Sequence, residues 1–168
     1  MKNEFTLTIY SEDQIRLITK LSSMFLRKQI QILSLNISIC EIENMYRHTI
    51  VVNESLGTVI NLAAQIEKII EVFKCYYSSN DEIVSKQMVL FKMATEVFLA
   101  NANMESLLRE NDLKVSEIER EYVILQTVGT DEEMEQLTEK LKRFGLIEFI
   151  KSSRIALMKS SEGFCVEI

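Results

Sequence analysis

The sequence predicts an α+β protein of two successive units, each with the element order βαββαβ. Segments in which apolar and polar residues alternate are interleaved with segments whose apolar residues recur every three or four positions. This succession occurs twice within 168 residues. The chain also contains no Pro and only four Gly, so we expect elements joined by short polar loops rather than by a flexible linker.

The first unit begins with an alternating segment at residues 5–10, which predicts a half-buried strand. A loop and a helix start follow, with Ser11 or Asp13 as the N-cap, and the helix is expected to reach about Gln29. The remaining elements are predicted as a strand at 32–40 with its odd-numbered apolar residues on one face, a strand at 46–53, a helix at 56–70 and a strand at 72–77.

The second unit repeats this pattern after the polar stretch 78–82. Its elements are predicted as a strand at 86–93, a helix at 95–110, strands at 113–119 and 122–128, a helix from Thr130 to Gly145 and a last strand at 146–158 that is interrupted near 151–153. Both units are therefore expected to be ferredoxin-like, with two helices on one face of a four-stranded antiparallel sheet. The predicted domains are 1–78 and 83–159, followed by a tail at 160–168.

The composition excludes several classes of function. The net charge is −6 and the pI is near 5.0, whereas binding to nucleic acid needs clustered positive charge. No apolar stretch is long enough to span a membrane, and the chain starts directly with a strand pattern instead of a signal peptide. Three widely spaced Cys fit neither disulfides nor zinc. These features predict a cytoplasmic protein with reduced thiols.

The residues give no catalytic chemistry. His48 is the only histidine, and its place in an alternating strand predicts a half-buried sheet residue without an acid or base partner. The acidic residues fit loops and helix starts better than a carboxylate pair or a metal site. Glycine-rich phosphate loops and nucleophile motifs are missing. We therefore expect no catalytic residue, no metal site and no cofactor bound by this chain.

One ligand position follows from the pattern alone. A loop that leads into a helix start presents unpaired N–H groups and the positive end of the helix dipole, which suits the carboxylate of a small ligand. In this chain that position is Asp13 to Arg16, and we expect it to lie next to the start of the second strand at Gln31 and Ile32.

The whole chain resembles the small regulatory subunit of acetolactate synthase (acetohydroxyacid synthase), which has an N-terminal ACT domain and a C-terminal ferredoxin-like domain. The segments that carry the resemblance are FTLTIY at 5–10, ILSLNIS at 32–38, RHTIVVN at 47–53 and GLIEFIKSSRIAL at 145–157. The ACT fold by itself would not define a function.

The resemblance implies a non-catalytic subunit of branched-chain amino-acid biosynthesis. Such a subunit binds a large catalytic subunit, which uses thiamine diphosphate, magnesium and FAD to condense two pyruvates, or pyruvate with 2-oxobutyrate. It raises that activity and confers feedback inhibition by valine or related amino acids. The resemblance also implies a homodimer with effector sites at its interface. The effector-binding residues would be Asp13, Arg16, Leu17, Gln31 and Ile32.

Three positions depart from the family pattern, which usually has Asn at Asp13, Gly at Arg16 and Asn at Gln31. Asp13 and Arg16 could pair with each other, or they could bind the ammonium and carboxylate of a ligand. Three interpretations stay open: a degenerate pocket without valine control, which the three changes favour, altered amino-acid binding, or unchanged feedback. The alternative function is a stand-alone ACT-type amino-acid sensor that regulates another enzyme.

Overall fold

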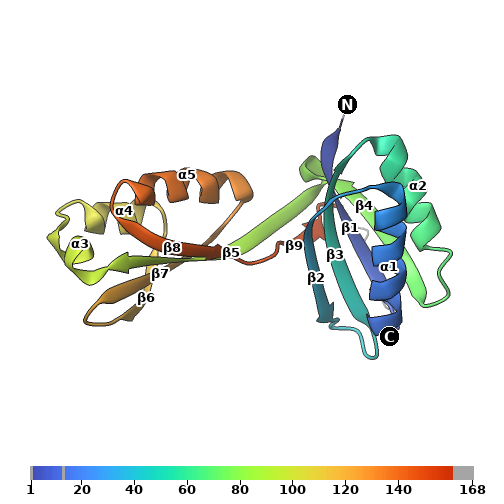
Figure 1. Ribbon diagram of the computed structural model, residues 1–168, viewed down its shortest axis with the longest axis horizontal. Coiled ribbons are helices and arrows are strands. Elements are labelled where there is room, and N and C mark those ends of the chain that lie inside the picture. The colour runs from blue at the N-terminus through green and yellow to red at the C-terminus, as the bar shows by residue number, and fades with distance from the viewer. Residues whose placement is uncertain (1, 13, 161–168) are drawn as a thin grey trace. The chain divides into compact units, whose positions relative to one another are not determined.

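The computed structural model describes residues 2–12 and 14–160, which form two compact units (Figure 1). Of the described residues, those up to Ser85 and those from Arg154 onward make up the first unit, and Lys86–Ser153 make up the second. The borders of the units differ from the predicted domain ranges 1–78 and 83–159, because residues 79–85 and 154–159 lie with the first unit. Distinct roles for two domains remain a prediction. The predicted tail lies outside the described residues beyond position 160.

The first unit has the predicted order βαββαβ (Figure 1). Its elements are β1 (Asn3–Ser11), α1 (Gln14–Lys28), β2 (Ile32–Ile39), β3 (Tyr46–Glu54), α2 (Leu56–Ile66) and β4 (Val72–Ser79). The strands form an antiparallel sheet in the order β2-β3-β1-β4. The α+β, ferredoxin-like prediction is therefore confirmed for this unit.

One core holds the helices of the first unit on its sheet. It forms because β1 turns every second side chain towards the helices, while each helix turns an apolar stripe towards the sheet. The core residues from these three elements are Phe5, Leu7 and Ile9 from β1, Leu17, Leu21 and Phe25 from α1, and Val59, Leu62, Ala63 and Ile66 from α2.

The second helix is shorter than predicted. It ends at Ile66, and the chain continues in tight turns with hydrogen bonds from Lys68 N to Gln65 O and from Ile69 N to Ile66 O. Ile70, expected on the buried stripe, is 97% exposed. The spacing of apolar residues therefore predicted a helix end that is too late. Apolar residues in the turns after Ile66 continue the helical spacing over a few positions.

The edge strand β2 exposes most of the apolar residues that were predicted to share a face. Leu35 pairs with Ile50 and Ile39 pairs with Tyr46, so both lie on the side of the sheet that carries the core. They are nevertheless 43% and 76% exposed. Among the described strands, only β3 pairs with β2, which leaves one edge of β2 open.

The second unit contains helices and strands like those of the first, but its first helical segment is divided into two helices. After η1 (Asn80–Glu82), the elements are β5 (Ile83–Ala94), α3 (Thr95–Ala100), α4 (Met104–Glu110), β6 (Lys114–Ile118), β7 (Tyr122–Gly129), α5 (Asp131–Lys142), β8 (Leu146–Lys151) and β9 (Ile155–Met158). Of these, η1, the first three residues of β5 and β9 belong to the first unit. The sheet order is β6-β7-β5-β8, with β9 pairing with β5. Its core contains Val89, Phe91, Met93, Met104, Leu113, Val123, Leu125, Met134, Leu137 and Leu141.

The prediction of one continuous helix at 95–110 is wrong. Asn101 has an extended backbone, and its side-chain oxygen accepts a hydrogen bond from the N–H of Asn103. Asn competes with helical hydrogen bonds in this way, so α3 ends at Ala100 and α4 begins only at Met104. Val97, expected to be buried, is 39% exposed, whereas Met104 lies in the core.

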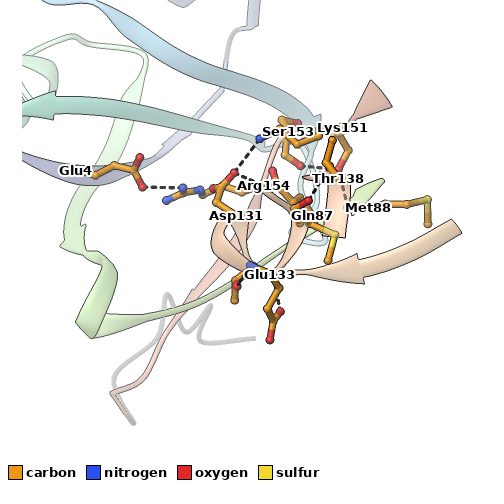
Figure 2. A network of polar contacts seen from close by, with 12 residues as sticks. Glu4, Gln87, Met88, Asp131, Glu133, Thr138, Lys151, Ser153 and Arg154 are labelled. Atoms are coloured by element: carbon orange, nitrogen blue, oxygen red, sulfur yellow. Dashed lines mark hydrogen bonds and ion pairs between the residues drawn. The ribbon is translucent and has the colours of Figure 1, made fainter. Parts of the chain in front are cut away.

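The predicted interruption of the last strand is confirmed, since β8 ends at Lys151 and β9 starts at Ile155. Arg154 precedes β9 and is only 7% exposed. Its Nη2 lies 2.7 Å from Oε1 of Glu4 on β1 (Figure 2). Its Nη1 donates to Oδ1 of Asn80 at 3.1 Å. This buried guanidinium therefore anchors the C-terminal strand to the first unit, by a contact between residues 150 positions apart.

Candidate effector site

The loop between β1 and α1 is fixed against a second loop of the same unit. The N–H of Glu12 donates to the carbonyl of Glu71, at 3.0 Å, in the connection between α2 and β4. The first N–H groups of a helix have no acceptor within it, so the start of α1 offers donors and a positive dipole end. Asp13, the first predicted site residue, lies outside the described residues.

A cluster of charges stands beside this helix start. Lys20 Nζ lies 2.7 Å from both carboxylate oxygens of Glu71. This hydrogen bond is the main reason that the pKa of Glu71 is lowered, and the positive charge of Arg16 lowers that pKa further. Arg16 itself is exposed on the first turns of α1. Glu71 thus holds Lys20 of α1 beside the loop.

Beneath the loop lies a polar pair that sequence reasoning did not predict. His48 is wholly buried rather than half-buried, and its Nε2 lies 2.9 Å from Oγ of Ser11, which is also buried. Burial lowers the pKa of His48 to about 4, so the ring is neutral near pH 7. Among the residues that the structure describes, no group hydrogen-bonds Nδ1 of His48.

The other predicted site residues differ in their surroundings. Leu17 is completely buried in the core, so it could contact a ligand only through its backbone. Gln31 is exposed, and Ile32 is partly buried against the core. Gln29, with φ of 55°, directly follows α1 and begins the connection to β2.

The register corrects one expectation: Gln31 and Ile32 are not next to the start of α1 within one chain. Ile32 pairs with Val52, which pairs with Phe5 near the start of β1. The loop follows Ser11 at the other end of β1, six positions from Phe5, or about 20 Å along a strand. The prediction failed because β2 starts where α1 ends, which is the end of the sheet opposite to the start of α1.

The described residues show no other group with evident reactivity. No three His, Cys, Asp or Glu side chains in this part of the chain cluster as metal ligands would. Cys40 and Cys75 are free, and burial raises the pKa of the Cys75 thiol to about 12, which makes that thiol unreactive. Cys165 lies outside the described residues. No helix within the described part is both long and apolar enough to cross a bilayer.

The fold and the loop together define an ACT-like protein of two ferredoxin-like units. Residues 86–160 match the family model described as the small subunit of acetolactate synthase. The acetolactate synthase small subunit of Mycolicibacterium smegmatis is 28% identical over 160 residues, covering 94% of this chain and 92% of the relative. The small subunit of Bacillus subtilis is 23% identical over 163 residues, covering 96% and 93%.

A solved structure agrees with the fold along the chain. The acetolactate synthase small subunit from Thermotoga maritima superposes with a TM-score of 0.82 at 18% identity, covering 95% of this chain and 99% of that one. The resemblance predicted from the sequence is therefore confirmed: the chain is similar to acetolactate synthase small subunits along both units.

Proposed function

We propose that this chain is the regulatory subunit of an acetolactate synthase, which binds and activates a large catalytic subunit. The observation that carries this proposal is the extent of the similarity, since relatives named as small subunits match across both units and not only in the ACT-like one. Thiamine diphosphate, magnesium and FAD would be bound by the large subunit, which would carry out the condensation of pyruvate for branched-chain amino-acid synthesis.

A homodimer would complete the effector site. The open edge of β2 can pair with the same strand of a second copy, and a two-fold axis makes that pairing antiparallel. The start of β2 in one copy then lies beside its end in the other. That end is Ile39, level with Tyr46 and Ser11. Gln31 and Ile32 of the second copy would thereby approach the Asp13–Arg16 loop of the first.

Valine feedback would be weakened or lost in this chain. Gly at a helix start leaves space for a ligand to approach the backbone, whereas Arg16 fills that space with a long side chain. Glu71 binds Lys20 at 2.7 Å, and the positive charge of Arg16 contributes to the lowered pKa of Glu71. A ligand carboxylate would have to compete with Glu71 for these cations.

The second candidate is a stand-alone amino-acid sensor that acts on another enzyme. The ACT-like unit with its loop is compatible with this role, but the match of residues 86–160 to the small-subunit model favours the first proposal. Both candidates predict a partner protein, and they differ in its identity.

Co-purification and reconstitution distinguish the two. The tagged full chain should bring down a thiamine-diphosphate enzyme, and adding the chain to that purified enzyme should raise its rate of acetolactate formation. Recovery of a different enzyme or a repressor, with no change in acetolactate formation, would support the sensor instead. Pyruvate turnover by the chain alone would contradict both.

A further inference from the structure

The second unit contains a cleft separate from the candidate effector site. It has a volume of about 350 Å³, at the lower end of the range for small-molecule pockets. The last residues of α4, the turn after it, the end of β7 and one side of α5 form its walls, and Lys86 of β5 closes it. All of these residues belong to the second unit.

The floor of the cleft is buried, and its rim is charged. Thr127, Met134 and Leu137 are each at most 5% exposed and form the floor, where Met134 and Leu137 supply the apolar surface, while most of the accessible lining of the cleft is polar. The rim carries three cations and three acids, which are Lys86, Arg109 and Lys140, and Glu110, Asp112 and Glu133. The rim therefore has a net charge near zero although the chain as a whole carries −6.

Only some of these charged side chains are paired within the protein. Lys140 Nζ donates to the side-chain oxygen of Asn111 at 3.4 Å. Its partner is thus a neutral residue, with the acids Glu110 and Asp112 on either side of it in the chain. Within the described ranges 2–12 and 14–160, the side chains of Arg109, Glu110 and Asp112 have no hydrogen bond or ion pair. Lys86 and Glu133 form an ion pair at 3.5 Å, so the charges of the cleft that remain for a ligand are those of Arg109, Lys140, Glu110 and Asp112.

The position of Asn111 is well defined. Its Nδ2 donates to the carbonyl of Leu107 at 2.8 Å, and its carbonyl accepts from Oγ1 of the buried Thr127. The turn that carries Glu110 and Asp112 is therefore held against β7. A ligand would meet walls that are already in place, which limits the entropy cost of binding.

We propose that this cleft binds a small zwitterion, an α-amino acid with an apolar side chain, independently of the first unit. The carboxylate would face Lys140 and Arg109, the ammonium would face Glu110 and Asp112, and the side chain would lie on Leu137. Phosphorylated ligands are disfavoured, because three acids offset the three cations. The balance of charge around an apolar floor is the feature that selects a molecule with both signs.

Titrations of the ¹⁵N-labelled full chain followed by NMR test this proposal. L-alanine, L-valine and L-leucine are added at millimolar concentrations, beside isobutyrate and isobutylamine, which each lack one of the two charges. We expect saturable amide shifts at Thr127 and Leu137 with at least one amino acid. Each single-charge compound should bind about tenfold more weakly, since it loses one charge-assisted contact.

Two variants and one control assign the site. K140Q and D112N should each weaken the titration about tenfold, whereas K114Q on the exposed strand β6 should leave it unchanged. The proposal is overturned if no amino acid gives saturable shifts at Thr127 and Leu137, or if K140Q binds like the unmodified chain. Equal binding of isobutyrate would also overturn it, by assigning a plain anion site. None of these outcomes depends on whether the chain activates a synthase.

Discussion

Nε2 of His48 on β3 and Oγ of Ser11 on β1 lie 2.9 Å apart, and neither side chain is exposed. The pair sits at the end of β1 from which the effector loop starts, so the loop rests on a buried polar contact within an otherwise apolar core. The register explains the position, because Ile9 pairs with His48 and Ser11 pairs with Tyr46 two residues before it.

This relationship predicts a loss of stability in mild acid. The pKa of His48 is about 4 in the folded protein and near 6.5 when the chain is unfolded. Between these values the unfolded state binds more protons, so the free energy of unfolding falls as the pH drops through this window and does not change further below it. We expect His48 to account for a loss of about 2 kcal/mol between about pH 7 and pH 5.

Urea denaturation of the wild type and of H48M at both pH values measures this loss. H48M should lose about 2 kcal/mol less than the wild type over the same interval, because Met carries no titrating group. The double variant S11A/H48M is the control for the serine hydroxyl and should show the same flattened pH dependence. An equal loss in the free energy of unfolding between the two pH values for the wild type and H48M would contradict a buried neutral imidazole.

A second prediction concerns the buried Arg154, whose Nη2 lies 2.7 Å from Glu4. E4Q removes the carboxylate and leaves the guanidinium buried, so we expect a loss of about 2 kcal/mol in the free energy of unfolding. The double variant E4Q/R154M should recover part of that loss, because it removes the uncompensated charge while keeping a long side chain. Chemical denaturation of the three proteins measures both effects.

The matched control for E4Q is K2Q, which breaks the contact of 2.7 Å between Lys2 and Glu54. The Lys2 side chain is 65% exposed, whereas that of Arg154 is 7% exposed. Exposed pairs contribute little, so K2Q should cost less than about 1 kcal/mol. If E4Q and K2Q cost the same, Arg154 is not the anchor of β9.

A third prediction concerns the edge of β2. If two copies pair through this edge, then I39K places a charge at an interface and should shift the protein towards a monomer of 19.5 kDa. I70K is the matched control, because Ile70 is also a highly exposed isoleucine of the first unit, at 97% against 76% for Ile39. Light scattering after gel filtration gives the mass. A dimer that survives I39K would exclude pairing through this edge.

The spacing of apolar residues along the chain correctly predicted the elements whose buried face follows a regular period. Phe5, Leu7 and Ile9 alternate in sequence and lie in the core, and the stripe of α1 through Leu17 and Leu21 lies there too. Asn101 shows where this spacing fails as a guide. The segment 95–110 has helical apolar spacing throughout, but the side chain of Asn101 accepts a hydrogen bond from the N–H of Asn103 and divides it into two helices.

The candidate site was predictable only in part, since its partners are distant in sequence. Lys20 and Glu71 are 51 positions apart, and Ser11 and His48 are 37 apart, so spacing gave no signal for either pair. The same limit explains Gln31, whose distance from the loop follows from the register of β2 on β3. The presence of a loop at the start of α1 did follow from the sequence.

We propose that the loop at Asp13–Arg16 no longer binds valine, although the fold around it is kept. Calorimetric titration of L-valine into the full chain, and into D13N/R16G/Q31N, tests this claim most directly, with glycine as the ligand control. We expect no saturable heat for the wild type at micromolar valine and a gain of binding in the triple variant. Micromolar binding of valine by the wild type would contradict it.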